Sequence, residues 1–161
     1  MKDFATEPAV YGIVLVAGLV AISAEGAEEP WAVLVKVAAT VLVFWAAHVY
    51  AGAVAHLGEG DDPGLSVRTR LRKALAHSLD HSWGMLGAAL IPVLVLLLGV
   101  LNVLSHQQAV WGTLWVSVLL LGVLGYVKVA AWSTRPAIRW ASAAVTSTLG
   151  LALILLKTLV H

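Results

Sequence analysis

Five long apolar stretches, separated by short polar segments, dominate the chain. They cover residues 9–23, 31–56, 83–104, 110–132 and 137–160. A membrane-spanning helix needs about 20 predominantly apolar residues. The pattern therefore predicts an all-α, polytopic membrane protein with five transmembrane helices in a single domain of residues 1–161. The expected helices cover residues 6–24, 31–56, 83–104, 110–132 and 137–160.

The segment 65–82 has a different, two-faced pattern. At about 100° per residue, one helical face is apolar and the opposite face is polar. The apolar face holds Val67, Leu71, Leu75 and Leu79, and the polar face holds Arg70, Lys73, His77, Asp80 and His81. We predict an amphipathic cytoplasmic helix before the third membrane helix, either lying in the interface or running directly into that helix.

Composition agrees with a membrane location. The chain is 60% hydrophobic and 12% charged, whereas an average soluble domain has about a quarter charged residues. A net charge of +1 does not indicate binding to nucleic acid. Cysteine is absent, so disulfides, thiolate metal sites and a cysteine nucleophile are excluded.

The basic residues are distributed unequally between the two sides of the predicted bundle. If the N-terminus is cytoplasmic, 8 of the 10 basic residues lie at inner ends or loops: Lys2, Arg68, Arg70, Arg72, Lys73, Lys128, Arg135 and Arg139. Only Lys36 and Lys157 lie towards the outside. The positive-inside rule then predicts a multi-pass protein of the cell membrane with its N-terminus in the cytoplasm and, after five crossings, its C-terminus outside.

A stripe of small side chains follows the last predicted helix. Its members recur at intervals of four, three, four and four residues: Ala137, Ala141, Ala144, Thr148 and Ala152. Small residues at this spacing let another helix approach closely in a membrane. We therefore expect the stripe to close the bundle by packing against another of its own helices. Besides the lipid bilayer, we expect a homo-oligomeric partner, because a chain with five spans and a polar second helix favours an oligomeric pore or carrier.

No motif in the sequence points to catalysis. The predicted spans carry no deep Asp or Glu, and the chain has no G-x-S-x-G, H-E-x-x-H or phosphate-binding glycine motif. We expect neither an enzyme nor a bound cofactor.

The second predicted helix is the most polar span and the main candidate site. It carries Lys36, Thr40, His48, Tyr50 and His56. Because imidazole can change its charge near neutral pH, these residues could form a polar path for protons or small ions. Alternatively, His48 could only bond to a hydroxyl of Thr146, Ser147 or Thr148 and tie two helices together.

Two further sites lie in the amphipathic segment. His77 and His81, with Asp80 between them, could supply three ligands to a divalent metal, and His56 a fourth. The neighbouring cations oppose a metal, and contact with anionic lipid headgroups is a simpler role for them. These cations are Arg68, Arg70, Arg72 and Lys73.

The phrases FWAAHVYAG, EPAVYG and ILLKTLVH resemble those of small integral membrane proteins of actinobacteria. This resemblance implies a membrane protein and no particular activity. Three functions stay open: an oligomeric channel or carrier for protons or small ions, a histidine-based haem or metal protein, and a non-catalytic membrane scaffold or partner subunit. The polar second helix favours the channel or carrier.

Overall fold

The computed structural model describes residues 7–23, 29–59 and 66–160, and all regular structure within these ranges is α-helical. The helices are α1 (Glu7–Ser23), α2 (Pro30–Glu59), α3 (Val67–Val100), α4 (His106–Ala130) and α5 (Pro136–Val160). The predicted all-α fold is thus confirmed. Four helices, α2 to α5, are long and apolar enough to cross a membrane, whereas α1 is a shorter apolar helix of 17 residues.

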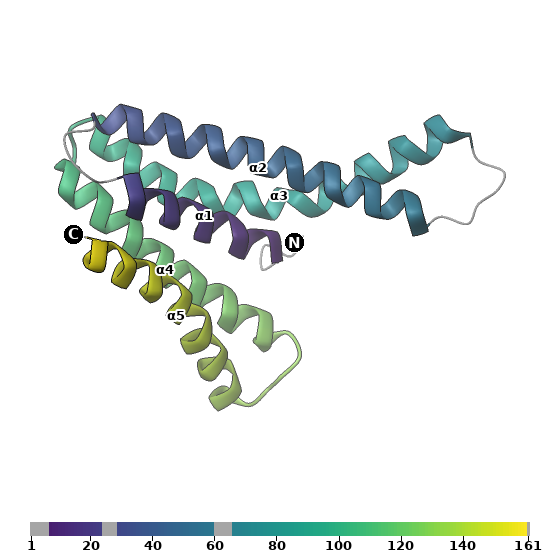
Figure 1. Cartoon of the computed structure of the whole chain (residues 1–161). Helices are drawn as coiled ribbons and strands as arrows, with labels where there is room; N and C mark the ends of the chain where they lie inside the picture. Colours follow the sequence, from purple (N-terminus) through teal and green to yellow (C-terminus); the bar gives the residue numbers. More distant parts are fainter. Residues whose placement is uncertain (1–6, 24–28, 60–65, 161) are drawn as a thin grey trace.

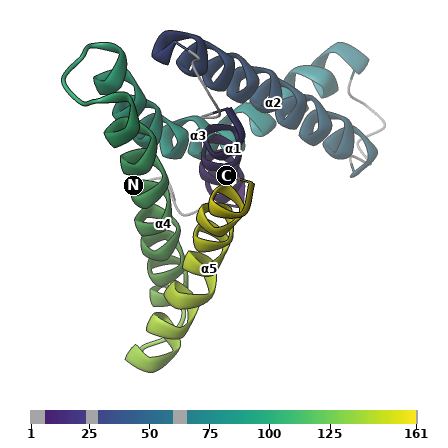
Figure 2. The same cartoon turned by 60° about the vertical axis from the view of Figure 1, so that its left-hand side comes forward.

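The helices form two hairpins that diverge from a common end. In Figure 1 the ends joined by the α1–α2 and α3–α4 connections gather at the left, together with the C-terminal end of α5. From there the α2–α3 hairpin runs to the right and the α4–α5 hairpin runs downwards. The turned view in Figure 2 confirms that the two hairpins separate, with α1 between them. Successive helices therefore alternate in direction around a short central helix.

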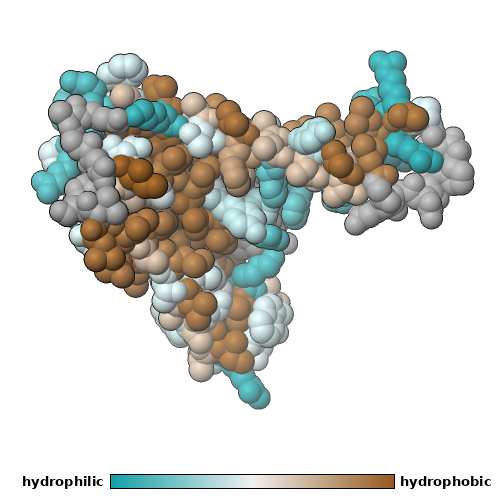
Figure 3. All heavy atoms as spheres, viewed as in Figure 1, coloured by the Kyte–Doolittle hydropathy of each residue, from teal (hydrophilic) through white to brown (hydrophobic). Residues whose placement is uncertain are grey.

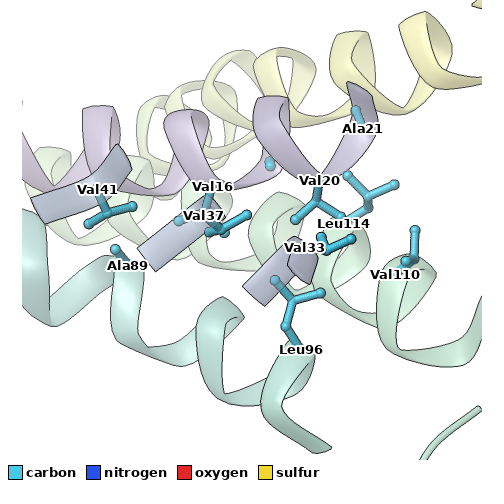
Figure 4. Close-up of a cluster of buried hydrophobic side chains, with 11 residues drawn as sticks. Val16, Val20, Ala21, Val33, Val37, Val41, Ala89, Leu96, Val110 and Leu114 are labelled. Carbon is cyan, nitrogen blue, oxygen red and sulfur yellow. The ribbon is translucent and has the colours of Figure 1, made fainter. Parts of the chain in front are cut away.

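α1 holds the two hairpins together through its buried apolar side chains. It packs against all four other helices, and Figure 4 shows Val16 and Val20 of α1 beside Val37 of α2 and Leu114 of α4. Close backbone approach adds to this packing. A Cβ atom at Gly12 would lie 2.5 Å from the carbonyl oxygen of Met85 in α3, so the backbones of α1 and α3 approach closely at this level.

Local capping signals explain why α3 ends and α4 begins earlier than the apolar pattern predicts. Asn102 adopts φ 57°, a left-handed conformation that stops α3 at Val100. The Ser105 side chain accepts a hydrogen bond from the Gln108 backbone N–H, and the Gln108 side chain accepts one from Ser105 N–H. This capping box starts α4 at His106.

The amphipathic segment 65–82 is not a separate element. From Val67 it is continuous with the third predicted span in one helix of 34 residues, which is about 51 Å long. Of the two predicted arrangements, the structure shows the one in which the segment runs directly into the third membrane helix. α2, with 30 residues, is about 45 Å long. Both helices exceed the hydrocarbon thickness of a bilayer, which is about 30 Å.

The excess length forms a projection that we call the arm, made of residues 50–57 of α2 and 67–82 of α3. In Figure 1 the arm extends beyond α1 and the α4–α5 hairpin. Figure 3 shows hydrophilic atoms at the far end of the arm and at the lower tip, where α4 turns into α5. Hydrophobic atoms cover much of the surface between these two ends.

Candidate functional site

The polar residues of α2 lie on different sides of the helix. Lys36 and Tyr50 are exposed, and the Thr40 hydroxyl donates to the Lys36 carbonyl oxygen at 2.8 Å within the same helix. At about 100° per residue these three residues fall within an arc of about 80°. His48 is half-buried and lies about 80° from Thr40 and 160° from Tyr50. The five predicted path residues therefore do not line one face of α2.

Among the residues that the structure describes, the α5 hydroxyls bond elsewhere, so the predicted bond between one of them and His48 is wrong. Thr146 donates to the carbonyl oxygens of Ser142 and Ala143, and Thr148 donates to that of Val145, all within α5. Ser147 donates to the Val118 carbonyl oxygen in α4 at 3.4 Å. The physical reason is the position of α1 between the hairpins, which leaves α5 packed mainly on α4.

The histidines of the arm form a pair between two helices. The rings of His56 in α2 and His77 in α3 are stacked, with centroids 4.1 Å apart and an interplanar angle of 25°. His81 and Asp80 are exposed on the next turn of α3. No group of three or more His, Cys, Asp or Glu side chains suited to a metal ion occurs among the residues the structure describes. Within the described residues the predicted ligand set of His77, Asp80 and His81 is therefore not assembled, although His77 does lie beside His56, the predicted fourth ligand.

The basic residues of the arm lie close to an exposed apolar strip. Arg68, Arg72 and Lys73 are exposed and Arg70 is half-buried. Exposed apolar side chains accompany them on the same helix: Val67, Leu71 and Leu75. The face of α3 towards α2 carries small buried residues, Ala74 and Ser78. This arrangement is compatible with the predicted contact between the arm and lipid headgroups, which stays a prediction.

A wide apolar groove lies between α4 and α5, and the sequence does not reveal it. Its volume is 540 Å³, and its lining consists of Val118, Leu119, Gly122, Val123, Tyr126, Trp140, Ala143, Ala144 and Ser147. The rings of Tyr126 and Trp140 meet edge to face at its end near the α4–α5 turn, with centroids 5.3 Å apart. Gly122 is the one sequence signal for this site, because a glycine in a membrane helix allows another helix to approach closely.

A smaller pocket joins α1 to the same hairpin. It has a volume of 220 Å³ and carries both charges, Glu7 of α1 and Lys128 of α4, beside Ser142 and Thr146 of α5. The Glu7 carboxylate also accepts a hydrogen bond from the Tyr11 hydroxyl at 2.8 Å. Neither this pocket nor the larger groove contains a residue of α2. The sequence could not predict the pocket because Glu7 and Lys128 are far apart along the chain.

Comparison of the chain with protein-family models, with curated proteins and with solved structures finds no match. The resemblance to actinobacterial membrane proteins therefore stays a prediction.

Proposed function

We propose that this chain is an integral membrane protein that crosses the cell membrane five times and acts without catalysis, as a packing subunit of a helical assembly. Four helices of suitable length and composition support the membrane placement. The cytoplasmic position of the arm and of the α4–α5 turn is proposed from their Arg and Lys residues. The non-catalytic role rests on the lack of a catalytic motif in the sequence.

The observation that carries the proposal is that α5 has two small-residue faces. One face packs on α4: Ser142 donates to the Gly125 carbonyl oxygen at 3.0 Å, and a Cβ at Gly150 would lie 2.8 Å from a Val118 side-chain carbon. The other face is exposed along its whole length: Ala137, Ala141, Ala144, Thr148 and Ala152. We call this exposed face the α5 stripe.

The α5 stripe supports an assembly because of how helices associate in lipid. The hydrophobic effect does not drive one apolar helix onto another in a bilayer, so association relies on close packing of small residues. Only 17% of the apolar window of α5 is buried. We infer that the α5 stripe meets the same stripe of a second copy.

The mass of the purified protein in detergent, measured by size exclusion with light scattering, tests this proposal. The wild type should be an oligomer, and the double variant Ala141→Leu/Thr148→Leu should be a monomer with an unchanged circular dichroism spectrum. Ala47→Leu is a matched control, since Ala47 is an exposed residue of α2. A monomeric wild type, or an oligomer that survives the double variant, would contradict the proposal.

An oligomeric conduit for protons or small ions is a second candidate. It is favoured by the arc of Lys36, Thr40 and Tyr50 on the outer face of α2, where Tyr50 is 72% exposed. Polar side chains facing lipid are costly, and several copies could enclose this arc. In that assembly α2 faces α2, so Ala47→Leu and not the α5 double variant would disrupt the oligomer.

A further inference from the structure

We propose that the groove between α4 and α5 binds an anionic phospholipid. One acyl chain of the lipid lies in the groove, and its phosphate lies at the α4–α5 turn. This inference rests on the membrane placement proposed above.

The groove has the dimensions and chemistry of an acyl-chain site. Its volume of 540 Å³ lies within the range of about 300–1,000 Å³ that is usual for small-molecule sites. From Val118 to Tyr126 it follows α4 for about 12 Å. Between Val118 and Val123 the groove contains one hydroxyl, that of Ser147, which donates to the Val118 carbonyl oxygen. An apolar chain can therefore fill the part of the groove between Val118 and Val123 without leaving a hydroxyl unpaired.

The end of the groove near the turn suits a lipid headgroup. Trp140 is 67% exposed, and the Tyr126 hydroxyl makes no hydrogen bond to another residue that the structure describes. Aromatic side chains with one apolar and one polar part prefer the membrane–water interface. The Tyr126–Trp140 pair therefore marks the level at which the acyl chain gives way to glycerol and phosphate.

Positive charge lies next to this end without an acidic residue on the same hairpin. Residues 101–161 contain no Asp or Glu. Arg135 is exposed one residue before α5 begins, and Arg139 immediately precedes Trp140. Arg139 Nε donates to the Ser133 carbonyl oxygen at 2.8 Å, which fixes the guanidinium at the turn and leaves its terminal nitrogens for another acceptor. Glu7 of α1 lies beside Lys128 in the smaller pocket, and a phosphate would supply an acceptor for Arg135 and Arg139.

Native mass spectrometry tests the site. The full chain, released from detergent, is titrated with phosphatidylglycerol or with phosphatidylcholine of the same acyl chains. We expect one phosphatidylglycerol to be retained in preference to phosphatidylcholine. Arg135→Gln should reduce that preference roughly fivefold, the effect of one basic residue at an anionic headgroup. Lys36→Gln, which removes an exposed cation of α2 away from the α4–α5 turn, should leave it unchanged.

Groove-filling variants test the acyl-chain part separately. Val123→Trp on α4 and Ala144→Phe on α5 should each abolish retention of the lipid, since both residues line the groove. Val145→Trp is the control, because Val145 is 67% exposed on α5 and does not line the groove. Both groove-filling variants are needed. Ala144 also belongs to the α5 stripe, so its variant could act on the oligomer, whereas Val123 lies outside the stripe.

Equal retention of the two lipids, or retention that survives Val123→Trp in a protein with unchanged circular dichroism, would overturn the inference. Loss of oligomers without loss of lipid in Val123→Trp would also overturn it, since a second copy would then occupy the groove. Failure of the proposed assembly gives a different result, a monomer that still retains phosphatidylglycerol.

Discussion

Gly52 of α2 and Ser78 of α3 lie in direct contact at the base of the arm. A Cβ atom at Gly52 would lie 3.3 Å from the Cβ of Ser78 and 3.0 Å from its Oγ. Ser78 is buried, and its Oγ has no hydrogen-bond partner among the described residues. The pairing of α2 with α3 thus continues into the arm, where His56 stacks on His77.

This contact predicts a disulfide in an engineered variant. The Cβ atoms of cysteines joined by a disulfide are usually about 3.5–4.5 Å apart, close to the 3.3 Å at positions 52 and 78. The double variant Gly52→Cys/Ser78→Cys should form an intramolecular disulfide in mild oxidant and resist maleimide labelling until reduced. The single variants serve as controls, because the chain has no other cysteine. Free thiols in the oxidised double variant would show that the arm is not paired in this register.

The contact between α1 and α3 predicts the effect of filling Gly12. Gly12→Ala places a Cβ 2.5 Å from the Met85 carbonyl oxygen, so the backbones must separate. Overpacking of this kind destabilises by about 1–3 kcal/mol, and thermal unfolding in detergent, followed by circular dichroism, should begin at a lower temperature.

Gly18→Ala is the matched control on the same helix. The nearest atom to a Cβ at Gly18 is Leu153 Cδ2, at 3.9 Å. This substitution should leave stability unchanged or raise it by up to about 1 kcal/mol, through the helix propensity of alanine. Equal effects at Gly12 and Gly18 would mean that α1 does not pack on α3 as described.

Much of the helical fold follows from the sequence, because length and polar connectors are local signals. α2 begins at Pro30 and α5 at Pro136, where proline fits the first helical turn. The boundaries of α1 and α5 also lie within one residue of those expected. The continuity of α3 was only one of two alternatives, since a two-faced pattern followed by an apolar one does not show whether the helix breaks.

The packing faces were harder to predict, for a physical reason. In lipid, a helix can be apolar on every side, so hydrophobicity does not distinguish a protein-facing side from a lipid-facing side. The prediction that the stripe from Ala137 to Ala152 packs within the bundle is therefore wrong: the stripe is exposed, and Ser142 and Gly150 pack against α4 instead. For the same reason the sequence cannot exclude a contact between His48 and α5, whereas in the structure α1 lies between the two hairpins.

Liposome measurements separate the two candidate functions. If the protein is a packing subunit, liposomes containing it should hold a proton gradient as long as protein-free liposomes do. A leak that Thr40→Val reduces would instead favour the conduit, because Thr40 belongs to the polar arc that it forms with Lys36 and Tyr50 on α2. A leak whose pH dependence changes in His48→Ala would show that His48 also lines the path.

The number of membrane crossings decides on which side each loop and terminus lies, and single-cysteine labelling measures it directly. With a membrane-impermeant maleimide, Gln107→Cys and Thr158→Cys should react in intact cells. Glu7→Cys, Arg72→Cys and Thr134→Cys should react only after permeabilisation, since α1, the arm and the α4–α5 turn are placed inside. Labelling of Glu7→Cys in intact cells would show that α1 does not cross, and labelling of Thr134→Cys together with Gln107→Cys would contradict the crossing of α4.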